Sequence, residues 1–79
     1  MSGIKALREL NVKEKGRVVE IRGSGSIRRR LMDMGVVKGS EVEVVRVAPL
    51  GDPIDVKIKG YHLSLRKANS ADIYVEVGE

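Results

Sequence analysis

Apolar and polar residues alternate most regularly on either side of the dipeptide Lys59-Gly60. Every second residue is apolar in 54–58 and again in 61–65, which is the pattern of strands that bury one face. A two-residue turn at Lys59-Gly60 would join the two segments into an antiparallel hairpin whose apolar side chains share one face. The predicted pairs are Ile58 with Tyr61, Val56 with Leu63 and Ile54 with Leu65, and the opposite face carries Asp55, Lys57, His62 and Ser64.

Three further segments, 17–22, 41–47 and 73–77, have strand-like patterns rich in Val and Ile. In 41–47 the spacing of the apolar residues changes after Val44, which predicts a β-bulge or burial on both faces. The N-terminal segment 1–12 is ambiguous, because apolar residues spaced by three can form one helical turn or lead into a strand. These apolar residues are Ile4, Leu7 and Leu10.

A short helix is predicted over 27–34. Ser26 can serve as its N-cap, and Gly35 suits the left-handed residue that ends a helix. The apolar residues of the segment fall at i, i+4 and i+7 on one face, and two turns are not stable alone, so we expect that face to pack on the sheet. The face consists of Ile27, Leu31 and Met34.

The composition supports one small β-rich domain. The chain has 79 residues and no cysteine, so we predict a single domain, 1–79, that is not stabilised by disulfides. Phe and Trp are absent, and the core must come from Val, Ile, Leu and Met. Five short strands, with a helix after the first, predict a mainly β fold: a small antiparallel β-barrel with a short inserted α-helix.

The net charge of +4 and the pI of about 9.7 favour acidic partners. Nucleic acid is not expected as a partner, because eleven acidic residues are interleaved with the basic ones and only two tyrosines could stack on bases. The N-terminus lacks an apolar signal core, and apolar runs are three residues or shorter. We therefore expect a cytoplasmic protein that does not insert directly into a membrane.

Arg28, Arg29 and Arg30 break a local rule of helix design. With Ser26 as N-cap they would occupy helix positions N2 to N4, where cations oppose the helix dipole at a cost of about 0.3–1 kcal/mol each. A departure of this kind is typical of a functional surface. The alternative is that the aliphatic stems cover the barrel while the guanidinium groups are solvated.

Two apolar residues are predicted to be exposed. Met32 lies off the apolar helix face and next to the arginines, while Leu50 is at the tip of a loop bounded by Pro49 and Pro53. Exposed apolar groups ringed by charge suit a protein interface. Both side chains could instead fold back over the open ends of the barrel.

Residues for metal chemistry or catalysis are few. His62 is the only histidine, and with Asp55 on the same predicted face it forms only a weak candidate metal site. We predict no resident cofactor, and at most weak binding of a divalent metal. No catalytic arrangement of a nucleophile, base and orienting group can be assembled, so we predict that the protein is not an enzyme. The run Gly23–Ser26 lacks the nucleotide-binding signatures and is interpreted as a turn.

Glycines, prolines and apolar residues follow a fixed order from Arg29 to Ile54. The order is Arg29-Arg30-Leu31, Met34-Gly35, Lys38-Gly39 and then Ala48-Pro49-Leu50-Gly51-Asp52-Pro53-Ile54, with a weaker continuation through Leu63-Ser64-Leu65-Arg66 to Ile73. This pattern resembles the FeoA family of bacterial ferrous iron transport. More distantly, it resembles the C-terminal SH3-like domain of iron-dependent regulators of the diphtheria-toxin-repressor type.

The resemblance implies an SH3-like barrel and a non-catalytic accessory protein that docks on the cytosolic G-domain of the membrane ferrous iron permease and modulates it. Two alternatives stay open: a transition-metal-binding or sensing domain like that of the repressors, which would bind Fe²⁺ or another divalent metal weakly, and a less favoured nucleic-acid-binding barrel. The predicted partner contacts are Arg28, Arg29, Arg30, Met32 and Leu50. The residues predicted to shape the surface are Gly35, Gly39, Pro49, Gly51 and Pro53.

Overall fold

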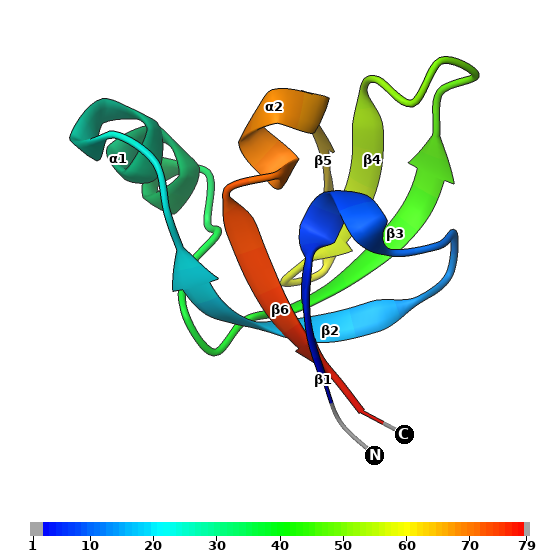
Figure 1. Cartoon of the computed structure of the whole chain (residues 1–79), viewed down its shortest axis with the longest axis horizontal. Helices are drawn as coiled ribbons and strands as arrows, with labels where there is room; N and C mark the ends of the chain where they lie inside the picture. The colour runs from blue at the N-terminus through cyan, green and yellow to red at the C-terminus, as the bar shows by residue number, and fades with distance from the viewer. Residues whose placement is uncertain (1–2, 79) are drawn as a thin grey trace.

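The computed structural model describes residues 3–78 and contains one antiparallel sheet of six strands within that range. The strand order is β1-β6-β2-β3-β4-β5, so β1 and β5 are the two edges and the sheet is not closed. Figure 1 shows the strongly curved sheet with the helical segments along one side. The strands are β1 (Gly3–Ala6), β2 (Lys15–Ile21), β3 (Glu41–Val47), β4 (Ile54–Ile58), β5 (Tyr61–Leu65) and β6 (Ile73–Val77), and the helices are the 3₁₀ segment η1 (Leu7–Glu9), α1 (Gly25–Asp33) and α2 (Lys67–Ser70).

The predicted β4–β5 hairpin is confirmed in every pair of its register, from Ile54 opposite Leu65 to Ile58 opposite Tyr61. The bulge in β3 is also confirmed, because the pairing with β4 shifts between Val44 and Arg46. One detail of the hairpin prediction was wrong. Tyr61 was expected to face inward, but its side chain is 43% exposed, and it reaches across to the end of α1.

The prediction of about five strands omitted β1, so α1 follows the second strand rather than the first. The segment 1–12 was left open between a strand and a helical turn, and it contains both in succession within its described part. Leu7 and Leu10 are buried, whereas Ile4 is 65% exposed. The spacing by three therefore did not mark one helical face. The single turn α2 was also not predicted, since four residues carry no periodic signal.

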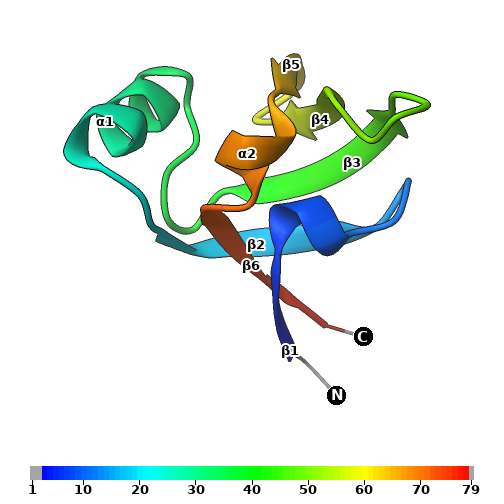
Figure 2. The same ribbon diagram turned by 45° about the horizontal axis from the view of Figure 1, so that its top comes forward.

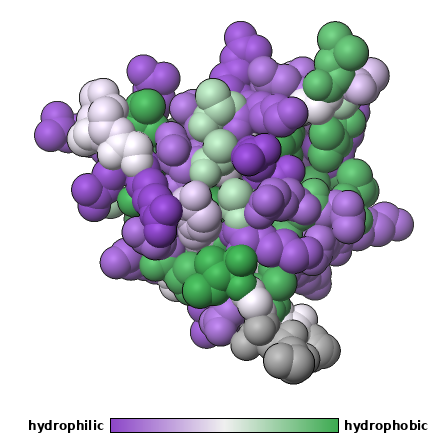
Figure 3. Space-filling model, viewed as in Figure 1, coloured by the Kyte–Doolittle hydropathy of each residue, from purple (hydrophilic) through white to green (hydrophobic). Residues whose placement is uncertain are grey.

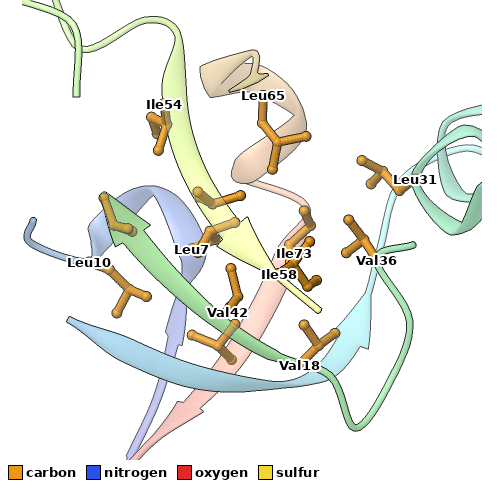
Figure 4. Packing of buried hydrophobic residues seen from close by; sticks show 13 residues of the cluster. Leu7, Leu10, Val18, Leu31, Val36, Val42, Ile54, Ile58, Leu65 and Ile73 are labelled. Carbon is orange, nitrogen blue, oxygen red and sulfur yellow. The ribbon is translucent and has the colours of Figure 1, made fainter. Parts of the chain in front are cut away.

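The core lies inside the curve of the sheet and is built from aliphatic side chains alone (Figure 4). Gly16 in β2 allows the close approach of β6, because a Cβ atom there would lie 2.8 Å from Val75 Cγ2. The core residues are Leu7, Leu10, Val18, Leu31, Val36, Val42, Val44, Ile54, Val56, Ile58, Leu65, Ile73 and Val75.

Two projections of the chain lie at opposite ends of the molecule. Figures 1 and 2 place α1 at one end, the β3–β4 loop at the other, and α2 between them. The molecule extends over 32 × 28 × 21 Å, so the two projections are separated by much of its longest dimension. Within residues 3–78, no helix is long and apolar enough to cross a bilayer.

Candidate docking surface

Helix α1 begins two residues earlier than predicted, at Gly25 instead of Ile27. The N-cap is Ser24 rather than Ser26, and its side-chain oxygen accepts a hydrogen bond from Ile27 N at 3.4 Å. Ser24 has the extended backbone that an N-cap requires, with φ −68° and ψ 162°, whereas Ser26 already lies inside the first turn. Both serines are chemically suitable caps, so the sequence alone does not choose between them.

The shift of the N-cap changes the interpretation of the three arginines. Counted from Ser24, Arg28, Arg29 and Arg30 occupy positions N4 to N6 instead of N2 to N4. The dipole effect is confined to about the first turn, so the predicted electrostatic penalty largely disappears. The arginines are therefore not an expensive feature of the helix, and their significance depends on their surroundings.

The C-terminal end of α1 is fixed in two ways. Gly35 has a φ of 96°, and the amides of Gly35 and Val36 donate to the carbonyls of Met32 and Leu31 at 3.0 and 2.9 Å. This is the Schellman arrangement, and it brings Val36 against Leu31, both buried. In addition, Tyr61 Oη donates to the carbonyl of Met34 at 2.7 Å, which joins the helix end to the β4–β5 hairpin.

One face of α1 packs on the sheet as predicted. Leu31 is completely buried, and Ile27 and Met34 are partly buried against the core cluster. Met32 points away from this face and is 49% exposed. Leu31 is therefore the main anchor of the helix in the core, and Met32 is an apolar residue on its outer surface.

Beside Met32 is a surface hollow of about 330 Å³. It is lined by Ile21 at the end of β2, by Arg28 and Met32, and by Val37 and Lys38 in the segment after α1. Sequence reasoning found Arg28 and Met32 but missed the other three residues. The spacing of Arg28 and Met32 by four was an available signal that they share a helix face. Ile21, Val37 and Lys38 are brought there only by the turn of the chain around α1.

Positively charged side chains surround the hollow. Within residues 3–78, no carboxylate oxygen lies within 4.0 Å of a side-chain nitrogen of Arg28, Arg29 or Arg30. By contrast, Arg22 is paired with a carboxylate, since its Nε donates a hydrogen bond to Glu20 Oε2 at 3.1 Å. This hydrogen bond lowers the pKa of Glu20 below its ordinary value, and the charge of Lys38 makes a smaller contribution. The arginines of α1 thus carry positive charge that the described part of the chain does not pair.

Leu50 does not join this surface. It is 93% exposed at the tip of the β3–β4 loop, where Figure 3 shows a hydrophobic projection at the upper right, away from α1. The loop is held by backbone hydrogen bonds from Ala48 N to the Pro53 carbonyl and from Gly51 N to the Ala48 carbonyl, at 3.1 and 2.7 Å. The predicted contact residues therefore form two separate regions, with the arginines and Met32 in one and Leu50 in the other.

The residues predicted to shape the surface divide in the same way. Gly35 and Gly39, with φ of 96° and 89°, flank the segment after α1, and Gly51, with φ of 83°, lies with Pro49 and Pro53 in the β3–β4 loop. All three glycines have the positive φ that favours glycine. Asp52 fastens this loop to α2, because its Oδ1 accepts a hydrogen bond from Lys67 N at 3.1 Å.

The weak metal candidates, His62 and Asp55, lie on the outer face of the β4–β5 hairpin. Asp55 accepts a hydrogen bond from Ser64 Oγ, and with His62 it lines a shallow hollow that also contains Arg46. A cation there would lie beside a guanidinium group. Among residues 3–78, no group of three or more His, Cys, Asp or Glu side chains could hold a metal ion.

The fold is similar to that of several solved structures. An FeoA-like protein from Clostridium acetobutylicum is 44% identical with a TM-score of 0.88, over 98% of this chain and 90% of that one. FeoA from Stenotrophomonas maltophilia, solved with zinc and described as a prokaryotic SH3 domain protein, is 29% identical with a TM-score of 0.75, over 95% and 88%. A manganese-dependent transcriptional repressor shares the fold at 18% identity and a TM-score of 0.89, over 99% of this chain and 44% of the repressor.

A comparison of sequences finds a relative in which a similar domain is fused to a second protein. The fusion of Fe(2+) transport protein A with the Fe(2+) transporter FeoB from Porphyromonas gingivalis is 39% identical over 71 residues. The match spans 90% of this chain but only 8% of that relative. The family model of the FeoA domain matches residues 5–77. These matches show that the chain belongs to the FeoA family, with the SH3-like fold that its sequence pattern predicted.

Proposed function

We propose that this protein is a cytoplasmic accessory subunit of ferrous iron transport that docks on the G-domain of the iron permease and modulates transport without carrying iron itself. The observation that carries the proposal is the relative in which an FeoA domain and FeoB are parts of one polypeptide. Domains joined in one chain are held at high effective concentration, which suits a pair that must act together. As a member of the FeoA family, the protein is an accessory domain and not an enzyme.

The surface around α1 is the proposed contact with the permease. It combines an exposed methionine, a hollow and three arginines that have no carboxylate within 4.0 Å in residues 3–78. Methionine and arginine are enriched at protein interfaces, and methionine adapts its shape to a partner. Leu50 is a separate exposed apolar group and is assigned to a second, smaller contact at the other end of the molecule.

The test uses the ¹⁵N-labelled protein and the permease in lipid nanodiscs. We expect amide signals of Arg28 to Lys38 to broaden or shift when the permease is added, and to be unaffected when its cytosolic G-domain has been deleted. The titration is repeated with a GTP analogue, because a regulatory contact should depend on the nucleotide state. Equal binding with and without the G-domain would contradict docking on that region.

A charge-matched pair of variants tests the surface itself. The double variant Arg29→Glu/Arg30→Glu should weaken permease binding by about tenfold or more, since like-charge juxtaposition at an interface costs several kcal/mol. Lys13→Glu/Arg46→Glu makes the same change in net charge at two exposed positions, one beside β3 and one within it, and should have little effect. Unchanged binding of the first variant would rule out the arginine surface, even if the permease is the partner.

A further inference from the structure

The hollow beside α1 has two kinds of wall. Ile21, Met32 and Val37 supply apolar surface, and Arg28 and Lys38 supply two cations at the rim. Its volume of about 330 Å³ is at the lower end of the about 300–1,000 Å³ typical of ligand sites. A hollow of this size and openness suits one or two side chains of a partner better than a whole cofactor.

The charges around the hollow restrict its occupant. A second copy of this chain, docked through the same surface about a two-fold axis, would place the three arginines of one α1 against those of the other. Like charges juxtaposed in this way oppose association. A single-stranded nucleic acid would need aromatic rings on which its bases could stack, and none lines this hollow.

An acidic protein segment fits both kinds of wall. Its carboxylates would complement Arg28 and Lys38, and its apolar residue would cover the exposed part of Met32. Arginine forms bidentate, charge-assisted hydrogen bonds with carboxylates, so the position of Arg28 at the rim would also fix the orientation of the segment. Arg29 and Arg30, which do not line the hollow, would act at longer range by steering the acidic partner towards it.

Resting on the docking function proposed above, we infer that the hollow receives one apolar side chain from an acidic segment of the permease, with flanking carboxylates bound by Arg28 and Lys38. The segment is thereby defined by its chemistry: an aliphatic or aromatic residue with Asp or Glu on either side. The same arrangement gives specificity, because a neutral apolar segment would leave the cations at the rim without partners.

The experiment compares Met32→Glu with Met32→Lys. Both substitutions remove the same thioether from an exposed position, both residues are good helix formers, and they differ in the sign of the charge placed at the hollow. Binding to the full-length permease in nanodiscs is measured for both variants at low and high salt. We expect Met32→Glu to bind at least about tenfold more weakly than Met32→Lys at low salt, and the difference to shrink as salt screens the charges.

A matched control places the same negative charge at another exposed apolar residue, Val12, which is 49% exposed like Met32. Val12→Glu should bind within about threefold of the unmodified protein, because Val12 precedes β2 and lies at the end of that strand remote from Ile21 and the hollow. Thermal unfolding of each variant shows that the fold is retained. A loss caused by folding would appear there, and it would affect Met32→Glu and Met32→Lys alike.

The outcomes separate this inference from the proposed function. If the permease binds the unmodified protein but both Met32 variants weaken binding equally, or Met32→Lys weakens it more, the partner segment is not acidic and the inference is overturned. If the permease does not bind the unmodified protein at all, the docking function itself fails. If Met32→Glu is the weaker variant and the difference is salt-sensitive, both proposals are supported.

Discussion

The α1 end and the β3–β4 loop end of the molecule both expose a large apolar side chain. The two ends differ in the interactions that stabilise them. At the α1 end, Leu31 is completely buried in the core and Met32 is half exposed beside a hollow with a cationic rim. At the other end, Leu50 is 93% exposed on a tight loop whose order depends on backbone hydrogen bonds and on the attachment of Asp52 to α2. The first end is a packed element, and the second is a hydrogen-bonded projection.

Exposure of an apolar residue does not by itself define an interface. Single exposed apolar side chains are common on protein surfaces. Met32 differs from Leu50 because it borders a concave region and lies among charges without nearby carboxylates in the described residues. Concavity and charge, more than the exposed fraction, are the reasons for proposing α1 as the main contact.

The largest expected difference between the two ends is in stability. Leu31→Ala removes the one fully buried side chain of α1 and should lower the free energy of unfolding by about 2–5 kcal/mol. Leu50→Ala removes an almost fully exposed side chain and should change it by less than about 0.5 kcal/mol. Urea unfolding followed by circular dichroism measures both.

For a domain of 79 residues with about 0.05–0.15 kcal/mol of stability per residue, the Leu31→Ala effect is a large fraction of the total. Amide signals of β4 and β5 report whether the sheet survives when α1 loosens. Equal losses for the two variants would show that Leu50 packs in solution and that the comparison is wrong.

Most of the sheet could be predicted from the sequence, because local alternation determines strand register. The β4–β5 hairpin has a two-residue turn between two regular apolar patterns, and its pairs were predicted residue by residue. Strand β1 could not be predicted in this way. Its four residues show no alternation of buried and exposed positions, and its pairing with β6 joins the two ends of the chain. Contacts at such long separation leave no local pattern.

The candidate site was only half predictable. Arg28 was singled out for a dipole penalty that the observed N-cap largely removes, and Met32 because it lies off the apolar face of the helix. Their neighbours Ile21, Val37 and Lys38 come from segments that lie before and after the helix, and nothing in their local sequence marks them. Tyr61 shows the converse error, since strand alternation predicted it to point inward, whereas its hydroxyl instead binds the Met34 carbonyl at the end of α1.

Replacing a glycine at either end should have an intermediate effect on the free energy of unfolding. Gly35 and Gly51 both have positive φ, at 96° and 83°, so replacement by Ala should cost about 1–2 kcal/mol at either site from backbone strain alone. A Cβ atom at Gly35 would clash with Tyr61 Oη, whereas at Gly51 the nearest atom is Lys67 Nζ at 3.7 Å. Gly35→Ala should therefore be the more destabilising variant, by the additional about 0.5–1.5 kcal/mol of the Tyr61 hydrogen bond.

The control for this pair is the same substitution in a protein that lacks the hydroxyl. In a Tyr61→Phe background the additional cost of Gly35→Ala should shrink, while that of Gly51→Ala should not change. The coupling is read from a double-mutant cycle of unfolding free energies. A coupling between Tyr61 and Gly51 as large as that between Tyr61 and Gly35 would contradict the independence of the two ends.

The smallest expected effects concern one side-chain hydrogen bond at each end. Tyr61→Phe removes the hydrogen bond to the Met34 carbonyl, and Asp52→Ala removes the acceptor for the Lys67 amide. Each loss should be about 0.5–1.5 kcal/mol, which is too small to disturb the fold but large enough to speed local amide exchange about two- to tenfold. Hydrogen exchange by NMR resolves the two regions.

The two variants should have separate footprints. Tyr61→Phe should speed exchange at Met34, Gly35 and Val36, whose amides close the end of α1, and leave Lys67 unchanged. Asp52→Ala should show the opposite pattern, because the Lys67 amide loses its acceptor while the end of α1 keeps all its hydrogen bonds. If either variant speeds exchange at both ends, the ends are coupled through the sheet, and binding at α1 would then be sensed at the Leu50 loop. Separate footprints would instead mean that a partner bound at α1 leaves the Leu50 loop unchanged and available for a second contact.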